Sequence, residues 1–114
     1  YFSASWCPPC RKFTPSLVEY YNKHAKADNF EIIFYTSDRS EKASEKYMQD
    51  YKMTWPAVSL KKMKYTDLNK FGGAGIPRLV LIDKEGKVVA DSYEGKKYKG
   101  PSVALKKMDE LKGR

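Results

Sequence analysis

The sequence predicts a single α/β domain in which a mixed sheet is flanked by helices on both faces. Three patterns support this class. Helical stretches alternate with short apolar runs, the early runs are separated by helices as in parallel sheets, and two later runs are joined by a tight turn as in a hairpin. With 114 residues, 41% of them hydrophobic, the chain suits one domain spanning residues 1–114 with its own core.

The first predicted elements are a strand and a long helix. Residues Tyr1–Ala4 are typical of the end of a buried strand. No initiator methionine or signal-peptide pattern is present, so we expect N-terminal elements of the domain to be missing from this sequence. A turn at Ser5–Pro9 leads into a helix that reaches about Ala27 and that Pro15 is expected to kink.

A second strand and a second helix follow. Residues 30–36 (Phe-Glu-Ile-Ile-Phe-Tyr-Thr) are aromatic and β-branched with little alternation, which is typical of a strand buried on both faces. A helix is predicted from an N-cap at or near Ser40 to about Tyr51. Residues 55–58 then form a short extended segment.

The second half of the chain predicts a short helix, a hairpin and a final helix. The short helix covers residues 64–71 and is closed by Gly72–Gly73. Apolar strands at 78–83 and 87–91 are joined by Lys-Glu-Gly, which indicates an antiparallel hairpin. An amphipathic helix begins at Pro101.

The two cysteines of the chain, Cys7 and Cys10, lie three positions apart at the predicted start of the first helix. A disulfide between them encloses only two residues, whereas a structural disulfide gains most by closing a long loop. The pair therefore favours a reversible redox site. Half of a zinc site is the alternative, but structural zinc takes four ligands, and the single histidine, His24, lies about four helical turns beyond Cys10. We expect no metal, although a metal or cluster shared between two chains stays open.

The net charge of +8 permits an acidic partner or nucleic acid. No zinc finger, RNP-like aromatic motif or glycine-rich phosphate loop accompanies the charge, so we interpret it as a solvated surface and expect no nucleic-acid partner. No run of about 18 apolar residues is present, so the sequence predicts no membrane span.

Three features together resemble the thioredoxin fold: Trp-Cys-Pro-Pro-Cys after an apolar strand, Pro15 five residues beyond the second cysteine, and Ile76-Pro77 before a strand hairpin. The sequence is more narrowly similar to the tryparedoxin/nucleoredoxin branch in residues 1–11, 30–34, 36–40, 55–58 and 75–77. The resemblance implies a redox-active disulfide centre and no cofactor.

The resemblance assigns roles to the residues around the cysteine pair. Cys7, at the helix N-terminus where the thiolate is favoured, is the expected nucleophile, and Cys10 is the more buried resolving thiol. Pro8 and Pro9 stiffen the turn between the two sulfurs and contact substrate. Trp6 is expected to form a flat substrate contact, with a buried core aromatic as the alternative.

The same resemblance places Pro77 as a cis-proline that faces the disulfide. Ile76, directly before it, is expected to offer its backbone N–H and C=O for β-like pairing with an extended substrate segment. Arg78 is an auxiliary candidate, expected either to contact acidic substrates or to be an exposed edge charge.

Two positions depart from the family pattern. The buried Asp that assists proton transfer in thioredoxins is replaced by Tyr1, which leaves Asp38 or Glu31, acting through water, as candidates; a solvated carboxylate is the alternative role for each. The tryparedoxin stretch Trp-Asp-Glu, which helps recognise trypanothione, reads Ser37–Arg39 here, so only its Asp is retained. This difference favours a general protein-disulfide reductase.

The function expected from the sequence is therefore that of a monomeric thiol–disulfide oxidoreductase in the cytoplasm. Its expected partners are disulfide-containing proteins and an upstream dithiol reductant or reductase. Two alternatives stay open: an extracytoplasmic, for example periplasmic, reductase of the cytochrome-maturation type, which shares the Trp-Cys-Pro-Pro-Cys motif, and a redox-sensing interaction module without turnover.

Overall fold

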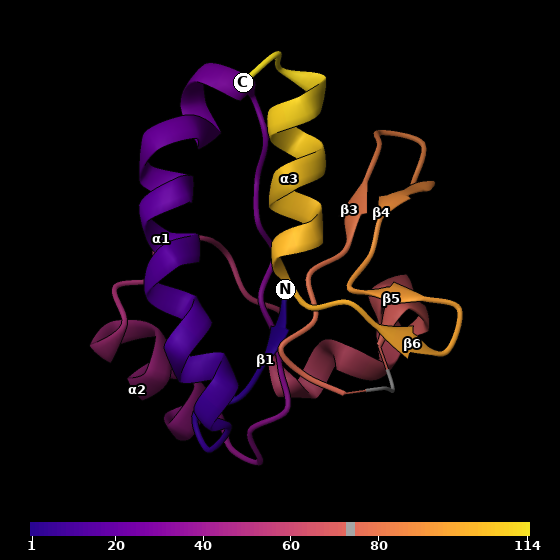
Figure 1. The fold of residues 1–114 in the computed structure, drawn as a ribbon. Helices are drawn as coiled ribbons and strands as arrows, with labels where there is room; N and C mark the ends of the chain where they lie inside the picture. The colour runs from indigo at the N-terminus through magenta and orange to yellow at the C-terminus, as the bar shows by residue number, and fades with distance from the viewer. Residues whose placement is uncertain (73–74) are drawn as a thin grey trace.

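The computed structural model describes residues 1–72 and 75–114 of the chain, so the predicted closing position Gly73 lies outside the described residues. Figure 1 shows helix α1 (Pro8–Asp28) and helix α3 (Ser102–Leu111) side by side. The hydroxyl of Tyr20 on α1 joins the two helices by donating to the Asp109 carboxylate on α3 at 2.6 Å. No helix in the described part of the chain is long and apolar enough to cross a membrane.

The centre of the fold is a mixed arrangement of extended segments. Strand β1 (Phe2–Ser3) pairs in parallel with β2 (Tyr35–Thr36). On its other side, Phe2 exchanges backbone hydrogen bonds of 2.8 and 3.0 Å with Arg78 in an antiparallel bridge. Directly before β2, Phe34 forms a parallel bridge with Ala57. Parallel and antiparallel neighbours therefore meet at β1, in agreement with the predicted mixed α/β class, although the regular pairing in the described residues is limited to two-stranded sheets.

The second strand is shorter than predicted. The prediction covered residues 30–36, but the ladder with β1 comprises only Tyr35 and Thr36, because the register places Phe2 and Ser3 opposite them. Before this ladder, the Ile33 carbonyl accepts a hydrogen bond of 2.9 Å from the Tyr1 backbone nitrogen. The strand predicted at 78–83 likewise reduces to the Arg78 bridge and β3 (Leu81–Ile82).

The first two helices begin and end near their predicted limits. Helix α1 runs without interruption through Pro15 and ends before Asn29, which takes the left-handed conformation common after helices at φ 56°. Helix α2 (Glu41–Asp50) starts at the predicted cap, where the Ser40 hydroxyl accepts the backbone N–H of Ala43 at 3.1 Å.

The prediction of a single helix over residues 64–71 is wrong. Two short 3₁₀ helices, η1 (Leu60–Tyr65) and η2 (Asp67–Phe71), occupy this region instead. Thr66 separates them because its backbone is extended and its hydroxyl accepts the Leu68 N–H at 3.2 Å, which starts a new helical turn.

The chain continues with two hairpins, of which only the first was predicted. Strand β3 pairs with β4 (Val88–Ala90). Strand β5 (Tyr93–Glu94) then pairs with β6 (Lys97–Tyr98) around Gly95, whose φ of 62° suits a two-residue hairpin loop. The arms of the second hairpin are too short to show an alternating pattern in the sequence.

An aromatic core connects the helices with the central strands. The ring of Tyr1 lies 6.0 Å from Phe13, 6.0 Å from Phe34 and 6.3 Å from Trp55, measured between centroids. Such distances are typical of favourable aromatic pairs. Tyr47 of α2 packs on Phe34 and is buried as well. This core fixes the residue directly before β1, the strand that leads into the turn that carries the cysteines.

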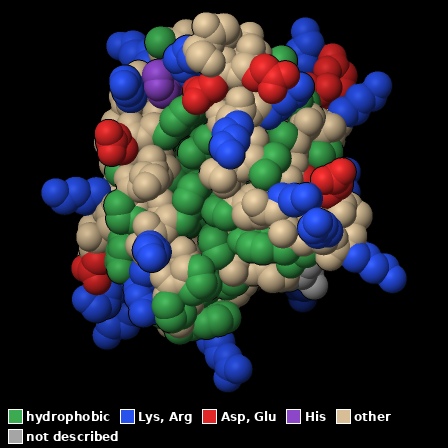
Figure 2. Space-filling model, in the orientation of Figure 1, with side chains coloured by type: hydrophobic (Ala, Val, Ile, Leu, Met, Phe, Trp, Pro, Cys, Tyr) green, Lys and Arg blue, Asp and Glu red, His purple; other side chains and the backbone are tan. Residues whose placement is uncertain are grey.

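The basic side chains form a dispersed surface on the face seen in Figure 2. Hydrophobic side chains gather in the middle of this face, while lysines and arginines project around its edges and are interrupted by acidic groups. This distribution agrees with the interpretation of the charge as a solvated surface.

Candidate active site

The cysteine pair lies at the N-terminus of α1. Cys7 and Cys10 are joined by a disulfide, with their Cα atoms 5.2 Å apart. Cys7 is the N-cap residue, and its sulfur accepts the backbone N–H of Cys10 at 3.3 Å. Cys10 is fully buried, whereas Cys7 retains 5% exposure, so the predicted order of burial is confirmed.

Two prolines explain why the helix begins here. Pro8 and Pro9 occupy the first helical positions, where a backbone N–H would lack an intrahelical partner in any case. The first turn closes with the Arg11 N–H donating to the Cys7 carbonyl at 3.0 Å. Both prolines are exposed, so their rings border the disulfide on the protein surface.

The Ile76-Pro77 loop faces the same disulfide. Its peptide bond is cis, as the sequence predicted. The Ile76 carbonyl oxygen lies 3.8 Å from the Cys7 sulfur, and the Ile76 side chain packs against a buried cluster of Ala4, Cys7 and Cys10. A group that approaches Cys7 therefore meets this loop as well.

Trp6 projects from the turn directly before Cys7. It is 60% exposed, so the alternative of a buried core aromatic is wrong. The second tryptophan, Trp55, takes the core position at 2% exposure. An exposed indole beside a reactive sulfur is suited to contact with another molecule.

The turn before Cys7 is held by Asp38. This carboxylate is buried and accepts three groups: the Ser5 N–H at 3.1 Å, the Ser5 hydroxyl at 2.7 Å and the Thr36 hydroxyl at 2.8 Å. The Ser5 carbonyl in turn accepts from the Arg11 guanidinium at 2.8 Å. Asp38 is therefore an anchor of the active-site turn, and the alternative of a solvated carboxylate is wrong for it.

Comparison with known proteins places this arrangement in a family. A family model described as thioredoxin-like matches residues 1–88. The chain belongs to the thioredoxin-like family. Human nucleoredoxin is 46% identical over 97 residues, which cover 78% of this chain and 21% of that protein. Tryparedoxin from Trypanosoma brucei brucei is 44% identical over 87 residues, which cover 75% of this chain and 59% of that protein.

Solved structures give the same assignment for the thioredoxin-like fold. Tryparedoxin II from C. fasciculata superimposes on all of this chain and on 72% of its own, with a TM-score of 0.74 and 30% identity. The resemblance to the tryparedoxin/nucleoredoxin branch is thereby confirmed. The chain spans about one fifth of human nucleoredoxin and about three fifths of the trypanosomal tryparedoxin.

In this thioredoxin-like chain, a network of buried hydroxyl groups contacts the backbone carbonyl of Cys10. The Thr14 hydroxyl donates to the Cys10 carbonyl at 2.8 Å, so its oxygen accepts from Tyr1 at 2.7 Å and from Tyr47 at 2.8 Å. The Ser3 hydroxyl completes the network at 2.8 Å from the Tyr47 oxygen. Burial raises the pKa of the Tyr1 phenol well above its usual value, which keeps this group protonated.

Sequence reasoning did not find Thr14 and Tyr47. Thr14 lies four residues after Cys10, one turn along the same helix face, which is a signal available in the sequence. Glu31, a proton-transfer candidate, accepts the N–H of its own neighbour Ile32 at 2.9 Å. No group in the described residues joins Glu31 to the cysteine pair, so its role there stays a prediction.

Arg78 is held by an ion pair. Its guanidinium donates two hydrogen bonds to the Asp91 carboxylate, at 2.9 and 2.7 Å, and lies 4.8 Å from the Tyr93 ring centroid. The Arg78 side chain is 14% exposed. The alternative of an exposed edge charge is therefore wrong, and contact with an acidic substrate stays a prediction.

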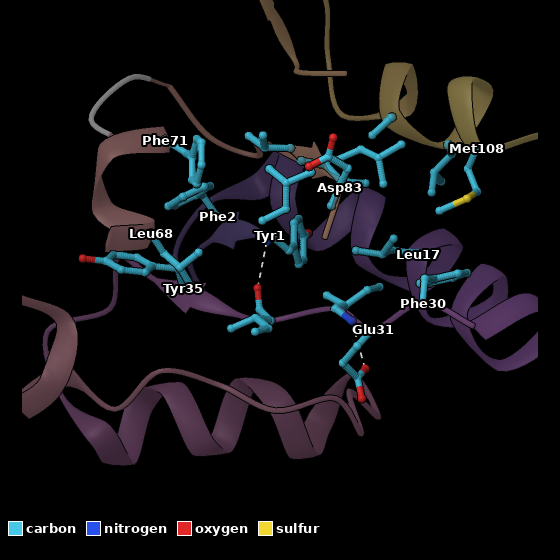
Figure 3. A pocket seen from close by; sticks show the side chains of 18 of the residues that line it. Tyr1, Phe2, Leu17, Phe30, Glu31, Tyr35, Leu68, Phe71, Asp83 and Met108 are labelled. Carbon is cyan, nitrogen blue, oxygen red and sulfur yellow. Dashed lines mark hydrogen bonds between the residues drawn. The ribbon is translucent and has the colours of Figure 1, made fainter. Parts of the chain in front are cut away.

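A cavity of about 400 Å³ lies away from the disulfide (Figure 3). It opens between residues 29–33 and 79–84, with Leu17 of α1 and Met108 of α3 along its wall. Neither cysteine lines it. The cysteine pair is therefore separate from this cavity and lies where the N-terminus of α1 meets the Ile76-Pro77 loop.

Proposed function

We propose that this chain reduces protein disulfides by dithiol–disulfide exchange, with Cys7 as the nucleophile and Cys10 as the resolving thiol. The observation that carries the proposal is the asymmetry of the pair. Cys7 caps the N-terminus of α1 and retains 5% exposure, whereas Cys10, in the first turn of the helix, is fully buried. Thiolates are favoured at helix N-termini, and attack requires access to the sulfur.

The reaction proceeds in two exchanges. In the reduced protein, the Cys7 thiolate attacks one sulfur of the substrate disulfide, and the other substrate sulfur leaves as a thiolate that takes up a proton. The Cys10 thiol loses its proton and attacks the Cys7 sulfur, which releases the second substrate thiol. Two electrons pass to the substrate, and the Cys7–Cys10 disulfide forms. An external dithiol then reduces this disulfide by the reverse sequence.

Backbone groups at the site support both exchanges. The Cys10 N–H, 3.3 Å from the Cys7 sulfur, stabilises negative charge on that sulfur while Cys7 is a thiolate or a leaving group. The loop at Ile76 and Pro77, together with exposed Trp6, Pro8 and Pro9, provides the substrate contact. Asp38 keeps the turn in place, and Arg78 lies next to the contact loop.

The proposed partners are disulfide-containing proteins and a dithiol reductant or reductase that restores the reduced pair. No metal or organic cofactor takes part in the exchanges as written. We assign the activity to a monomer in the cytoplasm, since a reducing compartment supplies the dithiol electrons that each cycle consumes.

Reduction of insulin disulfides with dithiothreitol tests the proposal on three proteins: the unaltered chain, Cys7→Ser and Cys10→Ser. We expect the unaltered chain to accelerate insulin reduction and Cys7→Ser to be inactive. We expect Cys10→Ser to accumulate mixed disulfides through Cys7, detected as adduct masses on the Cys7 peptide. An unaltered chain no faster than Cys7→Ser would favour a redox-sensing interaction module, and adducts on Cys10 in Cys7→Ser would reverse the assigned roles.

A further inference from the structure

The β5–β6 hairpin contacts the Ile76-Pro77 loop through two tyrosines. The hydroxyl of Tyr98, on β6, donates to the Pro77 carbonyl. The hydroxyl of Tyr93, on β5, accepts the backbone N–H of Gly75 at 2.7 Å. The two rings pack against each other with centroids 5.1 Å apart, so the two contacts come from one paired unit.

A third contact comes from the start of the same segment. Asp91 holds the Arg78 guanidinium by two hydrogen bonds, and that guanidinium also covers the ring of Tyr93. The segment 91–98 therefore holds the loop on both sides of Ile76, at Gly75 and at Pro77–Arg78. Arg78 is fixed a second time, because its backbone pairs with Phe2.

Ile76 is the residue left available between these fixed points. Within the described residues, neither its N–H nor its carbonyl has a hydrogen-bond partner; the carbonyl oxygen lies 3.8 Å from the Cys7 sulfur, which carries no hydrogen in the disulfide. Its position relative to Cys7 therefore depends on the packing of its side chain against the cysteine cluster and on how firmly the flanking residues hold its backbone. A loop held in its binding conformation loses less conformational entropy when a partner binds.

We infer that Tyr93 and Tyr98 are positioning residues that set the place of Ile76 beside Cys7 and thereby determine the affinity for extended protein substrates. This inference rests on the function proposed above. The tyrosines touch neither sulfur, so they act through the loop and leave the exchange steps themselves unchanged. A small disulfide that reacts with Cys7 without pairing to the loop does not depend on them.

Gly75 supplies an independent geometric observation. A Cβ atom added at Gly75 would lie 2.7 Å from the Tyr93 hydroxyl oxygen, and no other heavy atom outside its chain neighbours lies within 4 Å in the described structure. The close approach of the loop to the hairpin thus requires a residue without a side chain at position 75 and involves the phenol oxygen of Tyr93. Removal of the phenol oxygen makes room for an alanine.

The test compares Tyr93→Phe, Tyr98→Phe and the double variant with the unaltered chain, using insulin and the small disulfide 5,5′-dithiobis(2-nitrobenzoate). For the double variant we expect the KM for insulin to rise roughly three- to tenfold, the range that one or two lost hydrogen bonds produce, with kcat within about twofold. Rates with the small disulfide should stay within about twofold. Tyr65→Phe is the matched control, since Tyr65 is 77% exposed and remote in sequence from this hairpin.

A double-mutant cycle tests the geometry itself. Gly75→Ala should raise the KM for insulin, and Tyr93→Phe should suppress most of that effect, so the two changes are non-additive. Circular dichroism and thermal unfolding confirm that each variant folds; if the double variant does not, the single variants give the same comparison. Equal losses with both substrates, an unchanged KM, or strict additivity would each overturn the inference. An inactive unaltered chain would instead overturn the proposed function.

Discussion

The phenolic oxygen of Tyr1 lies 2.7 Å from the hydroxyl of Thr14, which itself donates to the carbonyl of Cys10. The residue that replaces the family's buried carboxylate is thus connected to the backbone of the proposed resolving cysteine through neutral hydroxyls. Burial raises the pKa of Tyr1, so this connection carries no charge at neutral pH.

Thr14→Val should destabilise the fold by about 2–4 kcal/mol. The side chain keeps its shape, but the phenol of Tyr1 loses its acceptor and Tyr47 loses one of its two partners, and a buried polar group without a partner costs about 1–3 kcal/mol. Urea unfolding followed by circular dichroism measures the change. Thr54→Val, the same substitution at an exposed position, should stay within about 0.5 kcal/mol. Equal effects at the two positions would mean that the network contributes nothing.

Asp38→Ala should destabilise the chain by about 2–3 kcal/mol and lower the insulin-reduction rate. Ser5 would lose the acceptor of both its N–H and its hydroxyl, and hydrogen bonds to charged groups contribute about 1.5–3 kcal/mol. The turn that presents Cys7 would then be less firmly held. Asp50→Ala is the control, since its exposed i,i+4 pair with Lys46 contributes about 0.5 kcal/mol or less. An Asp38→Ala variant as stable and active as the control would remove Asp38 as an anchor.

The Arg78–Asp91 pair predicts a specific acid dependence of stability. Burial alone would raise the pKa of Asp91, but hydrogen bonds from Arg78 and from backbone N–H groups outweigh it and lower that pKa below its usual value of 3.8. A carboxyl with a lowered folded-state pKa contributes its full stability above the unfolded pKa and loses it as the pH falls through the folded value. The unaltered chain should therefore lose more stability than Asp91→Asn between pH 6 and pH 3.

Thermal unfolding at several pH values measures this difference. Asp50→Asn should keep the pH dependence of the unaltered chain, because its carboxylate is exposed. Parallel curves for Asp91→Asn and the unaltered chain would contradict the contribution of the ion pair.

Trp6→Ala should leave the free energy of unfolding within about 0.5 kcal/mol, because the indole is largely exposed. If Trp6 contacts protein substrates, kcat/KM for insulin should fall roughly five- to tenfold, as expected when a central interface aromatic is removed. Leu111→Ala is the control: Leu111 is also an exposed apolar residue, and it is the last residue of α3, a helix whose C-terminal end lies far from the start of α1 (Figure 1). An insulin rate that is the same in both variants would exclude Trp6 from the contact surface.

The parts of the fold that could be predicted have local causes. Asn29 ends α1 and Ser40 starts α2 through their own backbone and side chain, so the chain around each is sufficient to place them. The cysteine pair and the cis bond before Pro77 followed from a short motif and from the resemblance that it supports.

The remaining features depend on residues far apart in the chain. Thr14 and Tyr47 meet across 33 positions, and Arg78 finds Asp91 across 13, so the role of each depends on a partner that local patterns do not specify. The strand predicted over 30–36 shortened for the same reason, since its ladder is set by the register of β1. The contacts of Tyr93 and Tyr98 with the Ile76-Pro77 loop likewise join residues that are distant in the sequence.

The complete burial of Cys10 also determines how the reduced protein responds to peroxide. In the reduced protein we expect peroxide to oxidise Cys7, the less buried of the two residues, to a sulfenic acid, because Cys10 is completely buried. We then expect the Cys10 thiol to condense with the sulfenic acid, with loss of water, to form the Cys7–Cys10 disulfide, which competes with a second oxidation to the irreversible sulfinic acid. The pair proposed here to reduce other disulfides would thereby also protect its own nucleophile from permanent oxidation.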